Sequence, residues 1–208
     1  MTTETRKSTD IRRTEIVDAG MRILAIEGAR QFTAERLGAM VGITGGSIFR
    51  HFDSMEEILD AIVDRIEEII FAGFPPQADD PLSALRQFFE HRVRAIREHP
   101  EISRLLLSEN LIPGAHSSAR EKRLREMKRR SRQFVIDCLS AASARGHLAA
   151  DVGPEEGALV VLGALHAIAH SRPRPGERKD QSQRVAKVWS ILERALTAPD
   201  HTKPTDAN

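Results

Sequence analysis

The sequence predicts an all-α fold of about nine helices, because apolar residues recur at three- and four-residue intervals along most of its 208 residues. No segment shows the strict alternation of apolar and polar residues that indicates a half-buried strand. Aromatic residues are few, with 8 Phe, 1 Trp and no Tyr, a composition typical of helical proteins built on Leu, Ile and Ala. We expect a small N-terminal domain joined to a larger helical one.

The charge balance indicates no particular class of partner, and the cysteine content excludes proteins stabilised by intramolecular disulfides or cysteine-based zinc sites. Lys plus Arg number 31 and Asp plus Glu 30, so the net charge alone does not indicate a nucleic-acid partner. The single cysteine, Cys138, allows neither an intramolecular disulfide nor a cysteine-based zinc site, which fits a reducing compartment. The N-terminal segment has no apolar core, and no apolar run reaches about 20 residues. We therefore expect a cytoplasmic protein without a signal peptide or membrane span.

The first three predicted helices cover about residues 10–27, 34–41 and 45–51. Their buried faces are marked by apolar residues at helical spacing. A glycine or a capping hydroxyl suited to end or begin a helix stands at each boundary: Gly28, Thr33, Gly42 and Thr44.

Six further helices are predicted downstream. Ser54 with Glu57, and Ser118 with Glu121, form capping boxes that begin two of them. Prolines stand at the first turn of two others. The predicted helices cover about residues 55–72, 81–98, 101–111, 119–145, 154–172 and 181–197.

The second and third helices have the spacing of a helix-turn-helix motif, which spans residues 33–52. Gly42 can adopt the left-handed conformation that the tight turn requires, and Ile43 can fill the gap between the helices. Such a pair alone is weak evidence for DNA binding. The long amphipathic helix before it and the capped helix after it strengthen the interpretation.

With these flanks included, the N-terminal third resembles the TetR/AcrR family of bacterial transcriptional regulators. The resemblance covers about residues 10–70, and beyond them only the number and order of helices match. The matching residues are Ile16, Ala19, Gly28, Thr33, Leu37, Ala39, Val41, Gly42, Ile43, Gly46, Ser47, Ile48, His51, Phe52, Glu57 and Leu59.

The resemblance implies a homodimer that binds double-stranded DNA, with each third helix in a major groove. It implies a helix-turn-helix domain over residues 10–70 and a ligand-binding and dimerisation domain over residues 71–198. A pocket in the larger domain would bind a small-molecule effector that weakens operator binding. We expect disordered tails at residues 1–9 and 199–208.

Several DNA contacts follow from the resemblance and from side-chain chemistry. Backbone amides of the two glycines could approach phosphates or base edges closely, or the glycines could merely ease a tight turn. Arg50 is the side chain best suited to read guanine, although it could equally be a solvated arginine. The predicted DNA-binding residues are Thr33, Thr44, Gly45, Gly46, Ser47, Phe49, Arg50 and His51.

Three positions depart from the family's pattern of DNA contacts. Phe49 stands where a tyrosine usually bonds a phosphate, and Met55 where a lysine often lies beside the backbone. Glu35 occupies a position that is basic in some members. These changes remove phosphate contacts but leave the fold unaffected.

The effector pocket is expected among the helices between residues 55 and 145, by the family's plan. Arg92, a guanidinium among apolar neighbours, could meet a ligand carboxylate, or its stem could simply cover apolar surface. The lining is apolar, so we expect a largely apolar effector with one acidic or hydrogen-bonding end. The candidate lining residues are Phe71, Phe88, Phe89, Arg92, Leu105, Leu106, Met127, Phe134, Cys138, His166 and His170.

The helix from Pro154 is apolar around most of its circumference, which implies burial on more than one side. Small residues on it permit close helix approach, so we expect a two-fold dimer through the last two helices. The predicted interface residues are Gly157, Gly163, Ala164, Ala167, Trp189 and Leu192.

His166 and His170 have the four-residue spacing of a helical metal pair. Without an obvious third ligand, core or interface histidines are the better interpretation, and a hydrogen bond to the effector stays open. We expect no metal, no cofactor and no catalytic site, because no nucleophile, base and orienting residue occur together.

The basic run at residues 120–132 could attract DNA, but the solvated side of a helix is the better interpretation. The opposite, buried side of that helix would carry Leu124, Met127, Ser131, Phe134 and Cys138. An alternative function is a DNA-organising or division-control protein of the same fold that responds to no small molecule.

Overall fold

The computed structural model describes residues 3–107, 119–171 and 181–197. Over these residues the regular structure is helical, apart from one isolated bridge between Leu148 and Thr197. The predicted all-α fold is confirmed. None of the described helices is long and apolar enough to pass through a lipid bilayer.

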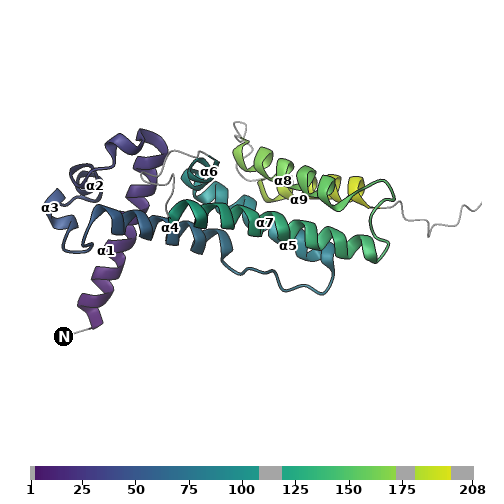
Figure 1. Cartoon of the computed structure of the whole chain (residues 1–208), viewed down its shortest axis with the longest axis horizontal. Coiled ribbons are helices and arrows are strands. Elements are labelled where there is room, and N and C mark those ends of the chain that lie inside the picture. The colour runs from purple at the N-terminus through teal and green to yellow at the C-terminus, as the bar shows by residue number, and fades with distance from the viewer. Residues whose placement is uncertain (1–2, 108–118, 172–180, 198–208) are drawn as a thin grey trace, which may run out of the picture. The chain divides into compact units, whose positions relative to one another are not determined.

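The chain forms two compact units (Figure 1). The N-terminal unit contains Met1–Ala72 and Glu98–Lys128, and the C-terminal unit contains Gly73–Arg97 and Arg129–Asn208. This division differs from the expected continuous second domain, because part of the chain after residue 97 joins the N-terminal core. The residues responsible are apolar members of that core: Ile102, Leu105, Leu124 and Met127.

The N-terminal unit begins with α1 (Thr3–Arg22), which continues through a short π-helical turn to Gly28, a residue with φ of 88°. Because α1 starts at Thr3, residues 3–9 are helical rather than part of a disordered tail as expected. Residues 199–208, the other expected tail, lie outside the described residues. The remaining helices of this unit are α2 (Ala34–Val41), α3 (Gly45–Ile48), α4 (Met55–Phe71), α6 (Pro100–Leu107) and the first part of α7 (Ala119–Ala144).

The predicted caps position α4 directly after the helix pair. Ser54 Oγ accepts a hydrogen bond from the Glu57 amide at 3.1 Å, and Glu57 Oε2 accepts one from the Asp53 amide at 2.6 Å. The capping box is therefore present, with its return bond one residue earlier than in the standard arrangement. The second predicted box, at Ser118, lies outside the described residues.

The third helix is shorter than the predicted span to His51. After Ile48 the amides of Arg50 and His51 bond carbonyls three residues earlier, at 3.2 and 2.9 Å. These bonds tighten the chain into turns and end the α-helix. The buried side chains of Ile48 and Phe52 hold both ends of this segment in the core.

The C-terminal unit is built from α5 (Pro81–Glu98), the rest of α7, α8 (Pro154–His170) and α9 (Gln181–Leu196). Asp80 Oδ2 accepts the Ser83 amide at 2.7 Å and so caps α5, whose first residue is the expected proline. The core of this unit includes Phe89 and Trp189, whose ring centroids lie 5.5 Å apart.

Candidate DNA-binding site

Two capped helices and a tight turn form the centre of the site. Thr33 Oγ1 accepts the Arg36 amide at the start of α2, and Thr44 Oγ1 accepts the Ser47 amide at the start of α3, each at 3.2 Å. Gly42 is left-handed with φ of 73°, as its place in the turn predicts. The helix-turn-helix prediction is thus supported by the local geometry at every joint.

The glycines of this motif have different roles. A Cβ on Gly45 would lie 3.1 Å from the Glu35 Cα, so Gly45 permits α3 to approach the start of α2. A Cβ on Gly38 would lie only 2.6 Å from the Ile43 carbonyl oxygen, which makes Gly38 the tightest contact of the pair. A Cβ on Gly46 would meet nothing within 4 Å and would face open space. Of the two glycines in α3, only Gly46 is therefore free to admit a close partner.

The residues predicted to contact DNA are all exposed or half-buried. Phe49 is 47% exposed, so its ring is accessible. Ser47 is bound to Thr44 through their hydroxyls, which are 2.8 Å apart. The exposed members are Thr33, Thr44, Gly46, Phe49 and Arg50, and the half-buried ones are Gly45, Ser47 and His51.

The departures from the family pattern are also visible. Glu35 is exposed at the first turn of α2. Met55 is half-buried and packs against the N-terminal core, so its side chain is divided between core and solvent. Neither residue has a side-chain donor for a phosphate, so the loss of backbone contacts at these two positions stays a prediction.

His51 is held at the end of this surface by Arg13 of α1. Arg13 Nη1 donates to the His51 carbonyl, and the guanidinium lies 4.0 Å above the Phe52 ring. The His51 Nδ1 is buried and has no hydrogen-bond partner among the described residues. Only the Nε2 edge of the ring is therefore in a position to reach a phosphate.

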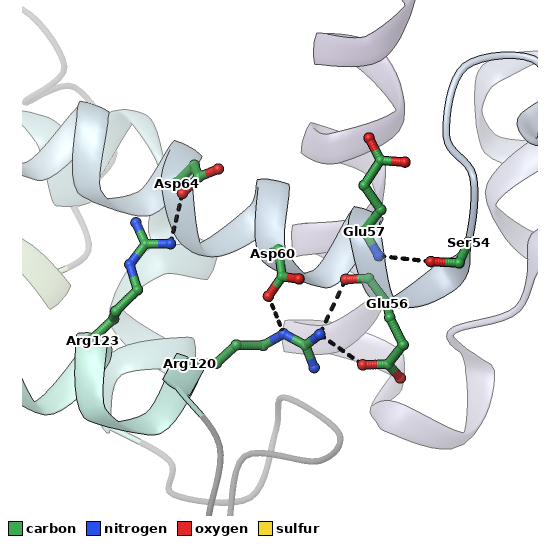
Figure 2. A network of polar contacts seen from close by, with 7 residues as sticks. All are labelled: Ser54, Glu56, Glu57, Asp60, Asp64, Arg120 and Arg123. Atoms are coloured by element: carbon green, nitrogen blue, oxygen red, sulfur yellow. Dashed lines mark hydrogen bonds and ion pairs between the residues drawn. The ribbon is translucent and has the colours of Figure 1, made fainter.

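The basic run at residues 120–132 is largely engaged in ion pairs. Figure 2 shows Arg120 and Arg123 of α7 directed at carboxylates of α4. Arg125 pairs with Glu121 on the same helix, and Arg132 pairs with Glu155 at 2.5 Å. Arg120 and Arg123 are half-buried against α4, whereas the other six basic residues are exposed, opposite the buried Leu124, Met127 and Cys138. The predicted solvated side of this helix is therefore confirmed, and the ion pairs do not suit a free DNA-attracting patch.

The predicted effector residues fall into both units. Four belong to the N-terminal cluster, and they are Phe71, Leu105, Leu106 and Met127. Another four pack in the C-terminal cluster, and they are Phe88, Phe89, Phe134 and Cys138.

Within the C-terminal unit, three phenylalanines and two arginines come together. Phe134 lies 4.9 Å from Phe74 and 5.2 Å from Phe88, measured between ring centroids. Arg92 lies over Phe88 and Arg130 over Phe74, at 4.9 and 4.8 Å. Arg92 is only 7% exposed, and burial together with the charge of Arg130 lowers its pKa to about 9. Three aromatic rings and two guanidinium groups are thus packed together in this unit.

The predicted dimer residues are only partly on the surface. Trp189, expected at the interface, is 1% exposed because it packs against Phe89 in its own unit. Gly157 and Leu192 are buried too, Gly157 beside Leu139. Gly163 and Ala167 are exposed and Ala164 is half-buried. Three large apolar side chains of α8 and α9 that the sequence pattern did not indicate are exposed instead: Leu159, Val160 and Ile191.

His166 and His170 stack with ring planes 12° apart and centroids separated by 6.5 Å. Each Nδ1 bonds the carbonyl four residues earlier, at 2.8 Å. Among the described residues no three His, Cys, Asp or Glu side chains are grouped as a metal ion requires.

Sequence reasoning did not select Gly38, Arg13 or Arg120 as functional residues. The two glycines Gly38 and Gly45, one in each helix of the pair and separated by six residues, could have indicated that α2 and α3 approach each other closely. For the arginines, the signal was the pair of adjacent glutamates at the start of α4, Glu56 and Glu57, which need counter-charges.

Together these features define the N-terminal unit as the helix-turn-helix module of a DNA-binding regulator. Residues 16–62 match the family "Bacterial regulatory proteins, tetR family", and residues 81–173 match "Tetracyclin repressor-like, C-terminal domain". The chain belongs to the TetR family, and it is a DNA-binding transcriptional regulator.

Curated relatives cover much of the chain at low identity. The transcriptional repressor KstR2 of Mycobacterium tuberculosis is 24% identical over 144 residues, which are 68% of this chain and 71% of KstR2. The nucleoid occlusion factor SlmA of Vibrio campbellii is 29% identical over 105 residues, which are 49% of this chain and 54% of SlmA.

Solved structures show the same fold. The KstR2 structure has a TM-score of 0.74 and 21% identity, with 90% of this chain and 95% of that chain covered. A complex of AibR with isovaleryl coenzyme A and operator DNA has a TM-score of 0.68 and 19% identity, with 87% and 97% covered.

Proposed function

We propose that this protein is a dimeric repressor that binds a palindromic operator and leaves it when a small effector binds. The observation that carries the proposal is the capped α2–α3 pair, in and directly after which Thr44, Gly46, Phe49 and Arg50 are all exposed. Arg50 is the side chain that can read guanine through two hydrogen bonds. Such a protein acts in the cytoplasm, where its operator lies.

Dimerisation is supported by the outer surface of α8 and α9. Leu159 and Ile191 are 76% and 58% exposed, and Gly163 and Ala167 lie exposed on the same helix as Leu159. Large apolar side chains beside small residues are suited to close helix packing against a second copy. Two-fold symmetry would place the recognition helices about 34–36 Å apart, in successive major grooves.

The effector is expected to be largely apolar with an acidic end. The rings of Phe74, Phe88 and Phe134 would hold the apolar body, and Arg92 and Arg130 the anion. AibR, a structural relative, was solved with an acyl coenzyme A thioester, a ligand that also joins an apolar group to anions.

Selection of bound duplexes from a random pool tests the operator, and the enriched duplex then serves to screen acids for release. We expect an imperfect palindrome, and Arg50→Ala should blur one position in each half-site. Enrichment of a single half-site without a symmetric copy would contradict the dimeric arrangement.

The similarity to the nucleoid occlusion factor SlmA, which covers about half of each chain, gives weak support to a second function, that of a DNA-organising or division-control protein without a small-molecule effector. The same screen distinguishes the two proposals. Release of the duplex by an organic acid, abolished by Arg92→Met, supports the repressor. Binding that no acid of the screen alters supports the DNA-organising function.

A further inference from the structure

The first turn of α4 carries two adjacent glutamates that are held by arginines from different helices. Glu57 Oε1 accepts a hydrogen bond from Arg13 Nη2 of α1 at 2.8 Å. Glu56 Oε2 pairs with Arg120 Nη2 of α7 at 2.7 Å. This turn follows directly on the segment that carries the DNA-facing residues, as Figure 2 shows for Ser54, Glu56 and Glu57.

On the α1 side, Arg13 contacts residues at both ends of the connection between α3 and α4. Arg13 bonds the His51 carbonyl, covers the Phe52 ring and pairs with Glu57. Glu57 in turn accepts the Asp53 amide. These bonds, the one from Arg13 first, hold the pKa of Glu57 below its ordinary value, so its carboxylate stays charged at neutral pH.

The α7 side is a row of ion pairs along α4. Arg120 Nε donates to Asp60 Oδ1 at 2.5 Å, and its Nη2 also donates to the Glu56 carbonyl at 3.2 Å. Arg123 continues the row, with Nη1 2.7 Å from Asp64 Oδ1 (Figure 2). Its Nη2 lies 2.8 Å from Glu67 Oε2. Isolated surface pairs contribute little, but forked arginines in a network are the exception.

We propose that Arg13 and Arg120 are positioning residues for DNA recognition, which grip the first turn of α4 from two sides and thereby orient residues 44–52. The inference rests on the proposed function. A four-residue helix followed by turns cannot fix its own direction, so its side chains need support from the elements around it. The Arg120 guanidinium contacts Glu56 and Asp60 of α4, and the side chain is only 11% exposed, so we expect it to contact no phosphate.

The test measures binding of Arg120→Gln to the duplex enriched by the wild type, at several salt concentrations. We expect affinity to fall about 10-fold, as for a residue within a coupled network. The slope of log K against log salt should stay unchanged, because no phosphate contact is lost. Discrimination between the enriched and a scrambled duplex should shrink, since misoriented side chains lose base contacts first.

Exchanging the charges of Arg120 and Asp60 tests whether Asp60 is the partner through which Arg120 acts. Arg120→Glu should weaken binding further, and adding Asp60→Arg should restore both affinity and discrimination. Arg125→Gln is the matched control, because Arg125 belongs to the same basic run but pairs with Glu121 on its own helix. It should bind like the wild type.

Several results would overturn the inference. One is unchanged affinity in Arg120→Gln, and another is a salt slope flatter by about 1.8, the loss of one phosphate contact per subunit in a dimer. Amide hydrogen exchange gives a readout without DNA, and exchange at residues 51–57 should quicken in Arg120→Gln. If that variant does not fold, Asp60→Asn takes its place with the same expectations. A wild type that enriches no duplex contradicts the proposed function, whereas unchanged exchange contradicts the positioning role.

Discussion

Replacing Gly38 by alanine should damage the helix-turn-helix motif, although alanine is the better helix former. A Cβ at this position would lie 2.6 Å from the Ile43 carbonyl oxygen and 2.9 Å from both the Gly45 amide nitrogen and the Thr44 carbonyl carbon. All three are backbone atoms of the turn, so no side chain can rotate away. The turn itself has to move.

The size of the effect follows from two opposing contributions. Overpacking of this kind costs about 1–3 kcal/mol, and the gain in helix propensity returns about 0.5–1 kcal/mol. Gly38→Ala should therefore lower the free energy of unfolding of the N-terminal unit by up to about 2.5 kcal/mol. Gly46→Ala is the matched control, because its Cβ meets nothing within 4 Å and its φ is not positive. It should leave stability unchanged or slightly raised.

Urea unfolding followed by far-UV circular dichroism measures both variants. Fluorescence of Trp189, the single tryptophan, reports separately on the C-terminal unit and should not change. Gly38→Ala should also weaken binding to the enriched duplex. The reasoning is refuted if Gly38→Ala is as stable as Gly46→Ala and binds the enriched duplex as tightly as the wild type.

Three further outcomes are expected. Met55→Lys should add one phosphate contact per subunit and steepen the salt slope of a dimer by about 1.8, whereas Met55→Gln should leave the slope as it is. Leu159→Glu with Ile191→Glu should convert a dimer into a monomer in light scattering, and a wild type that is already monomeric would contradict the proposed interface. The Cys138 thiol, whose pKa burial and Asp137 raise to about 11, should react with a disulfide reagent at pH 8 only after unfolding, because about one thiol in a thousand is ionised there. Rapid reaction of the folded protein would show that the thiol is accessible and activated.

Local signals allowed much of the fold to be predicted. Thr33, Thr44 and Ser54 cap helices as expected, and Gly28 and Gly42 adopt the positive φ that their positions predict. A cap depends on a few neighbouring residues, so its signal is contained in a short stretch of sequence. The end of α3 at Ile48 was not predicted. Backbone hydrogen bonds to the carbonyl three residues earlier replace the α-helical bonds there, and the residues that favour the two patterns differ little.

Features that depend on distant parts of the chain were harder to predict. The grouping of residues 98–128 with the N-terminal unit depends on packing of Leu124 and Met127, which periodicity marks as buried without naming their neighbours. Trp189 was assigned to the interface for the same reason, since a buried tryptophan can be covered by its own chain or by a partner. Its neighbour Phe89 lies on another helix, far away in the sequence.

The basic run at residues 120–132 shows how charge should be interpreted in such a sequence. Eight basic residues on one helix suggest a nucleic-acid surface only if their charges are free. Here four acidic residues recur along one side of α4 at steps of four, four and three: Glu56, Asp60, Asp64 and Glu67. They form ion pairs with Arg120 and Arg123 of α7. When acidic residues on one predicted helix and basic residues on another recur at matching intervals, packing of the two helices against each other is therefore a better interpretation than DNA binding. Since α7 continues unbroken from these arginines to Phe134 in the C-terminal core, the helix that grips α4 also carries a residue proposed to hold the effector.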